Sequence, residues 1–214
     1  MNVELFIIPV AAFNDKLHFY TAASSTFPSC KLSDDLHSFE AMRTVLLKYF
    51  SDDSEEFTQW LNSPRCKDRI IDVYDRNRLP EQRNSIAIVR AVSIPDNIAL
   101  RDKDSWYEPQ SLLNENSLLS QDNKLFLSEC LNLIPVWVKN TSFTFELMSR
   151  VFSIQELRLL VGTLSNQEID PGNFHRRLKK LDILRPLGVG QQRVHRWEFA
   201  WERCIALSAD GLIP

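Results

Sequence analysis

The first 161 residues of this 214-residue chain contain no glycine. All glycines lie in the C-terminal quarter: Gly162, Gly172, Gly188, Gly190 and Gly211. Phosphate-binding loops of the P-loop and Rossmann types need glycine, because the backbone must approach the phosphate closely and adopt positive φ. The sequence therefore argues against a nucleotide-processing enzyme of those types in the first three quarters. The change in glycine usage also predicts a domain boundary before the C-terminal quarter.

Charge divides the chain at a similar place. Residues 1–140 carry 15 basic and 20 acidic residues, whereas residues 141–214 carry 10 basic and 8 acidic residues. Between Asn173 and Arg196 there are seven lysine and arginine residues and two histidines, against the single acidic residue Asp182. One basic patch on an otherwise acidic protein is the pattern expected of a duplex-binding element attached to a non-binding body.

Residues 1–140 combine strand and helix patterns. Val3–Phe13 and Lys16–Thr21 are rich in β-branched and aromatic residues and flank the turn pair Asn14-Asp15, which predicts a hairpin. Apolar residues recur at helical spacing in Ser38–Phe50, with Ser38 as the N-cap. The later segments are predicted as helix, strand, strand and helix: Ser54–Asn62, Arg69–Tyr74, Asn84–Ile94 and Ser120–Lys139, the last bent or broken near Pro135. We therefore predict a compact α+β domain over residues 1–140.

No catalytic constellation is recognisable in this domain, and we expect no catalytic residue, metal site or cofactor. A residual hydrolase built on the acidic residues Asp34, Asp35 and Glu40 is the least favoured alternative, because such acidic clusters are usually solvated loops. The four cysteines form no CxxC pair and are interpreted as small buried hydrophobes: Cys30, Cys66, Cys130 and Cys204.

The apolar segments are short compared with a membrane helix. The longest, such as Leu5–Phe13, fall well below the roughly 18 residues that a membrane span needs. The N-terminal sequence has no positively charged region followed by a small-residue cleavage site, so we expect no signal peptide. We therefore expect a cytoplasmic protein without a membrane partner.

Residues 141–214 carry the pattern of a winged helix-turn-helix. Ser153 and Glu156 form an S-x-x-E capping box that opens one helix. Asp170-Pro171 opens a second helix whose buried stripe is Phe174, Leu178 and Leu181. Leu187–Gly190 is predicted as a glycine-marked turn, and Gln191–Phe199 as the second arm of a basic hairpin. The second helix of such a domain enters the DNA major groove.

The predicted DNA contacts divide into two groups. Asn173, Arg176 and Lys180 lie opposite the buried stripe, where they are expected to face base edges or the groove floor. The remaining residues are expected to contact phosphates: His175, Arg177, Lys179, Arg193, His195 and Arg196. The alternative is a winged-helix protein-interaction or assembly module without specific DNA binding, since basic helix faces are often only solvated.

The C-terminal sequence resembles the winged helix of the NrtR family, the Nudix-related transcriptional regulators. The 48 residues from FSIQELRLLVG through DPGNFHRRLKKLDILRPLG to RVHRWEF follow the family pattern. The matching positions are Phe152, Glu156, Leu157, Asp170, Asn173, Phe174, Arg176, Leu178, Leu184 and Gly188. His175 departs from the pattern, because arginine is usual there.

The resemblance implies a Nudix-like α/β/α sandwich in residues 1–140, followed by the winged helix in residues 141–214. The Nudix box itself is absent. If Arg43 is aligned with the box arginine, the Mg²⁺-binding glutamates fall on Leu47 and Lys48, which cannot hold the metal. The resemblance therefore implies an inactive effector or dimerisation domain rather than a hydrolase.

The same resemblance suggests the partners. We expect a homodimeric regulator, acting as a repressor, that binds a palindromic double-stranded operator with half-sites about one or two helical turns apart. A small-molecule effector, such as an NAD-related nucleotide, is implied for the N-terminal domain.

Overall fold

The structure is a computed structural model that describes residues 2–13, 16–22, 25–32, 38–50, 55–62, 70–78, 85–94, 96–99, 104–140, 143–189 and 194–204. Its N-terminal part is built on a mixed sheet with the strand order β4-β5-β1-β2-β6, and β3 also pairs with β1. The strands are β1 (Asn2–Phe13), β2 (Lys16–Tyr20), β3 (Ser29–Leu32), β4 (Ile70–Arg78), β5 (Ser85–Ser93) and β6 (Trp106–Tyr107).

The long strand β1 organises this sheet. On one side it pairs in parallel with β5 along its length. On the other side its first half, Val3–Phe6, pairs with β3 and its second half, Val10–Phe13, pairs with β2, both antiparallel. The predicted hairpin of the first two strands is thus confirmed.

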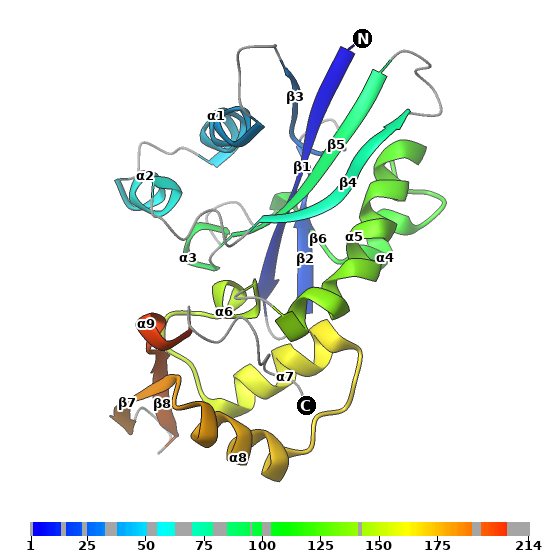
Figure 1. The fold of residues 1–214 in the computed structure, drawn as a ribbon. Helices are drawn as coiled ribbons and strands as arrows, with labels where there is room; N and C mark the ends of the chain where they lie inside the picture. Colours follow the sequence, from blue (N-terminus) through cyan, green and yellow to red (C-terminus); the bar gives the residue numbers. More distant parts are fainter. Residues whose placement is uncertain are drawn as a thin grey trace.

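Helices cover both faces of the sheet (Figure 1). On one face lie α1 (Ser38–Phe50), α2 (Glu55–Asn62) and α3 (Asp96–Ala99). On the other lie α4 (Pro109–Leu113) and α5 (Gln121–Asn140), while α6 (Phe143–Leu147) lies at the end of the sheet that is nearer the C-terminal part. Successive strand residues point to opposite faces, so Ile7 packs with the α1 side while Ile8 packs with the α5 side. The predicted Nudix-like α/β/α sandwich is confirmed.

Helix α5 continues through Pro135 to Asn140. Of the two alternatives predicted for Pro135, a break does not occur, whereas a bend stays a prediction. Its buried residue Cys130 lies in the core, where burial raises the pKa of the thiol to about 12. Cys204 is also buried and Cys30 is half-buried, whereas Cys66 lies outside the described residues.

The C-terminal part is a winged helix. It consists of α7 (Ile154–Ser165), α8 (Pro171–Leu181), β7 (Leu184–Val189) and β8 (His195–Phe199), followed by α9 (Trp201–Cys204). One hydrophobic cluster runs from the sheet residue Val10 through Leu127 of α5 and Leu160 of α7 to Phe174 of α8. The winged helix and the sheet domain are therefore packed together through a common apolar core.

None of the helices in the described part of the chain is long and apolar enough to cross a membrane.

Candidate nucleic-acid interface

Helix α7 begins with the predicted capping box. The backbone N–H of Glu156 donates to Ser153 Oγ at 3.2 Å, and the backbone N–H of Ser153 donates to Glu156 Oε2 at 2.6 Å. Two backbone donors at the helix start are thereby satisfied. Leu157, Leu160 and Leu164 are buried along one face of α7, which anchors the helix in the core.

The turn between α7 and α8 is tight. Asn166 caps α7 in the left-handed conformation with φ of 53°, and the N–H of Gln167 donates to the carbonyl of Gly162 at 3.1 Å. A Cβ atom at position 162 would lie 3.0 Å from the carbonyl oxygen of Gln167, so this close approach favours glycine. Arg158 then donates to the carbonyl of Ile169 at 2.9 Å, which fixes the segment that leads into α8.

Helix α8 begins as the sequence predicts. The side chain of Asp170 accepts a hydrogen bond from the backbone N–H of Asn173 at 2.7 Å, and Pro171 occupies the first turn. Phe174 and Leu178 are both 3% exposed, while Leu181 is partly buried. The predicted apolar stripe is confirmed, and it fixes which face of α8 points to solvent.

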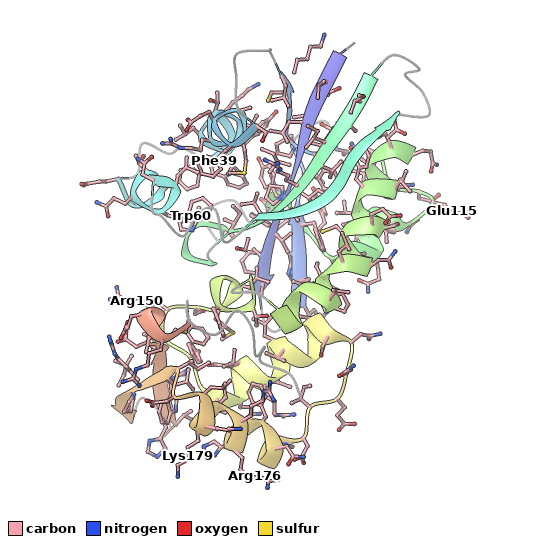
Figure 2. The ribbon with its side chains drawn as sticks, in the orientation of Figure 1. Phe39, Trp60, Glu115, Arg150, Arg176 and Lys179 are labelled. Atoms are coloured by element: carbon pink, nitrogen blue, oxygen red, sulfur yellow. The ribbon has the colours of Figure 1, made fainter. Side chains whose placement is uncertain are left out.

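The solvent face of α8 carries most of the predicted contact residues. Those exposed to solvent are Asn173, His175, Arg176, Lys179 and Lys180. Arg176 donates to the side-chain oxygen of Asn173, so two of the expected base-reading residues are already joined. Arg176 and Lys179 lie at the end of the molecule that faces away from the sheet (Figure 2). Arg177 is half-buried at the edge of the core.

The wing is a bulged antiparallel hairpin. Where β7 pairs with β8, Leu184 lies opposite Phe199 at one end and Val189 lies opposite His195 at the other. The register shifts between Pro186 and Gly188. Gly188 has φ of 102°. The prediction of a turn over Leu187–Gly190 is therefore wrong for Leu187–Val189, because this glycine forms a bulge within β7 rather than the end of the strand. Gly190 and the predicted contact Arg193 lie outside the described residues.

A short bridge joins the wing to the start of α7. The backbone N–H of Phe152 donates to the carbonyl of Trp197 at 3.0 Å, and the N–H of Trp197 donates to the carbonyl of Phe152 at 2.8 Å. The Phe152 ring also packs against Phe199, with 4.5 Å between their centroids. The wing is consequently held against α7 by backbone bonds as well as by the core.

An ion pair reinforces the same junction. Arg196 Nη1 lies 3.0 Å from Glu156 Oε2. Burial opposes ionisation of Glu156, but its hydrogen bonds with Ser153 and the nearby Arg196 charge outweigh this effect and lower its pKa. Of the predicted wing contacts, His195 is exposed, whereas Arg196 is half-buried and engaged by this carboxylate. The prediction missed this contact, because the two residues are 40 positions apart.

Two further arginines near the wing are also paired. Arg185 on β7 forms an ion pair with Glu202, and Arg203 on α9 forms one with Asp182, the residue that caps α8. These pairs lower the positive charge available beside the wing. The exposed cations of α8 therefore form the most clearly available basic surface of the winged helix.

The sheet domain does not offer a Nudix metal site at the aligned positions. Arg43 on α1 forms an ion pair with Glu40 and donates to the side chain of Asn62. Leu47 is half-buried and Lys48 is exposed on the same helix, and neither side chain suits Mg²⁺. Among the residues that the structure describes, no group of three or more His, Cys, Asp or Glu side chains is arranged to hold a metal. Asp34 and Asp35 lie outside that set.

Comparison with known proteins identifies the C-terminal domain. Residues 144–199 match the NrtR DNA-binding winged helix domain. No curated protein matches the chain.

Three solved structures share the fold over most of their length. Shewanella oneidensis NrtR superposes with a TM-score of 0.76 at 10% identity, covering 95% of this chain and 96% of that one. The same protein complexed with a 27mer DNA gives a TM-score of 0.73 at 10% identity, with 95% of each chain covered. A MutT/nudix family protein from Enterococcus faecalis gives 0.61 at 8% identity, covering 92% of this chain and 86% of that one. The chain thus has the fold of a Nudix-like domain followed by a winged helix, and its residues 144–199 are similar to the NrtR winged helix.

Proposed function

We propose that this protein is a sequence-specific DNA-binding transcription regulator that inserts α8 into the major groove. The observation that carries the proposal is the exposed face of α8, which presents basic and amide side chains while Phe174 and Leu178 hold the opposite face in the core. The match to the NrtR DNA-binding winged helix supports it. So does the structural likeness to Shewanella oneidensis NrtR, which has been crystallised with a 27mer DNA.

The proposed contacts follow the geometry of the winged helix. Asn173, Arg176 and Lys180 read base edges, since arginine and asparagine match guanine and adenine respectively. Residues on the flanks of α8 and on the wing hold phosphates: His175, Arg177, Lys179, Arg193, His195 and Arg196. For Arg196, contact with DNA competes with the ion pair to Glu156.

The Nudix-like domain is proposed to serve regulation rather than hydrolysis. If Arg43 is aligned with the box arginine, Leu47 and Lys48 take the positions of the metal-binding glutamates, and this alignment supports an inactive domain. We place the division of the chain at residues 140 and 141, with residues 1–140 as the effector and dimerisation domain. The protein acts in the cytoplasm as a homodimeric repressor on a palindromic operator, and an NAD-related nucleotide is the candidate effector.

Selection of bound sequences from a random duplex library by the purified protein tests this function. Near physiological salt, non-specific binding is weak and sequence preference is measurable. Enrichment of an inverted repeat is the expected result. A well-folded protein that enriches nothing would overturn the proposal and favour the protein-interaction alternative.

The inactive state of the Nudix-like domain is tested separately. The protein is incubated with Mg²⁺ and ADP-ribose or dinucleotides, and phosphate-containing products are measured. No turnover above a protein-free control is expected.

A further inference from the structure

Asn173 and Arg176 form a hydrogen-bonded pair on the solvent face of α8. The residues are three positions apart, so their side chains are neighbours on the helix surface, and Arg176 Nη2 donates to Asn173 Oδ1. Lys179 and Lys180 are also exposed on α8, but neither has a side-chain partner among the residues that the structure describes. Arg176 is therefore held in the free protein in a way that these two lysines are not.

The Asn173 end of this pair is fixed by the start of the helix. The backbone N–H of Asn173 donates to Asp170 Oδ1 at 2.7 Å. The next side chain, Phe174, is 3% exposed in the core. Since an asparagine side chain has only two rotatable bonds with few preferred angles, the fixed backbone leaves its amide group few positions.

The hydrogen bond defines which end of the Asn173 amide is engaged. A guanidinium has only N–H donors, so it binds the amide oxygen. An asparagine that recognises adenine uses both ends of its amide, with the oxygen accepting from N6 and the nitrogen donating to N7. A direct adenine contact by Asn173 would therefore have to share the oxygen that already holds Arg176.

The same bond leaves Arg176 able to recognise guanine. A guanidinium has five N–H donors, and Asn173 accepts from one of its nitrogens, Nη2. The remaining donors suffice for two hydrogen bonds to guanine O6 and N7. A free arginine side chain loses rotamer freedom when it binds, whereas Arg176 is already held and loses less, which favours binding.

We propose that Asn173 is a positioning residue, which orients the Arg176 guanidinium toward a guanine and sets base preference through Arg176. This role replaces the direct base contact that the helical position of Asn173 alone suggests. The specificity half of this inference rests on the proposed DNA binding, whereas the positioning half concerns the free protein. The two halves are therefore measured separately.

NMR of the free, full-length protein tests the positioning half. Nitrogen-15 relaxation of the arginine Nε–H groups reports how ordered each side chain is, and Arg176→Lys identifies the signal of Arg176. We expect this side chain to be ordered in the wild type and more mobile in Asn173→Ala. Asn132→Ala, which removes an exposed asparagine from α5, is the matched control and should leave Arg176 ordered. Equal mobility of Arg176 in the wild type and in Asn173→Ala would overturn the proposal.

Base-modified duplexes test the specificity half. The guanine preference that is present in the half-site selected by the wild type and absent from the one selected by Arg176→Ala is assigned to Arg176. Replacing that guanine with 7-deazaguanine removes its N7 acceptor, and fluorescence anisotropy measures the ratio of the affinities for the two duplexes. We expect this ratio to fall by about 2- to 10-fold in Asn173→Ala, the effect of about one hydrogen bond, and to stay unchanged in Asn132→Ala. An unchanged ratio in Asn173→Ala would contradict the positioning role.

A double-mutant cycle distinguishes positioning from direct reading. If Asn173 acts through Arg176, Asn173→Ala should weaken specific binding in the wild type and cause no further loss in the Arg176→Ala background. Asn173→Asp keeps an acceptor oxygen without the amide N–H groups, so it should retain the preference for the guanine, although its negative charge should weaken binding to all duplexes. Replacing each adenine with 7-deazaadenine should have the same effect with and without Asn173. A loss that persists without Arg176, or an adenine N7 that matters only when Asn173 is present, would refute the proposal.

The outcomes also separate this inference from the proposed function. A protein that selects an operator but fails the Asn173 tests refutes the inference and leaves the proposed function intact. A protein whose Arg176 is ordered by Asn173 but which selects no duplex refutes the proposed function and the specificity half, while the positioning half stands.

Discussion

Removal of Arg176 and Lys180 together is the most direct test of α8 as the DNA-reading helix. Both side chains are exposed on the face opposite Phe174 and Leu178. Alanine is a good helix former, and substitutions at such surface positions usually change the free energy of unfolding by less than about 0.5 kcal/mol. The double variant Arg176→Ala/Lys180→Ala is therefore expected to keep its fold and its melting temperature.

The expected loss of DNA affinity is large. A good base contact contributes about 1–3 kcal/mol, so the double substitution should weaken the binding free energy of one helix by about 2–6 kcal/mol. Since about 1.4 kcal/mol corresponds to a factor of ten, the affinity for one half-site should fall by about 30-fold or more. Fluorescence anisotropy with the selected duplex, beside a scrambled duplex, measures this change, and circular dichroism verifies the fold.

A matched variant distinguishes the loss of a direct contact between α8 and DNA from a general loss of positive charge. Lys31→Ala/Lys48→Ala removes the same number of positive charges from exposed positions on the Nudix-like domain and is expected to leave the affinity nearly unchanged. Lys179→Ala, as a phosphate contact, should weaken binding to all duplexes alike and reduce the salt dependence by about one unit per bound helix. Unchanged specific affinity in the folded Arg176→Ala/Lys180→Ala variant would refute the assignment of α8.

Three further predictions concern the junctions that hold the winged helix together. Ser153→Ala removes the N-cap acceptor of α7 and should lower stability by about 1 kcal/mol, which corresponds to about 2–4 °C in melting temperature. The lowered pKa of Glu156 means that its stabilisation is full above its ordinary pKa of 4.5 and is lost as the pH falls through the lower folded value. Accordingly, the stability advantage of the wild type over Glu156→Gln should shrink on acidification, and an advantage that grows instead would contradict this role. Gly162→Ala places a methyl group 3.0 Å from the Gln167 carbonyl, which must shift by a few tenths of an ångström, whereas Gly172→Ala meets only an ordinary 3.5 Å contact. Gly162→Ala should therefore be the less stable of the two variants, and thermal unfolding that ranked them the other way would contradict the role of Gly162 in the turn.

Elements with strong local signals were predictable from the sequence. Ser38–Phe50 has the observed bounds of α1, and Asp170 and Pro171 mark the start of α8. Capping residues and helical periodicity act within a few positions, so they are visible in the sequence itself. The same periodicity predicted which face of α8 is buried and which is exposed.

Features that depend on distant partners were not predictable. Strand β3 has only four residues and exists through its pairing with Val3–Phe6. A glycine at position 188 is compatible with a turn and with a bulge. Only the pairing register between β7 and β8 shows that it forms a bulge. The pairing of Arg196 with Glu156 likewise arises from tertiary packing.

The apolar cluster that continues from the sheet through α5 into α7 and α8 has a consequence for operator architecture. The orientation of α8 is set by the domain on which it is packed, so in the proposed homodimer the distance between the two α8 helices would be determined by how the Nudix-like domains associate. The bases recognised would depend instead on the proposed contact residues of α8. Under this proposal, spacing and base preference are encoded in different parts of the chain, and exchanging the exposed residues of α8 alone is expected to redirect the protein to new half-sites at an unchanged separation.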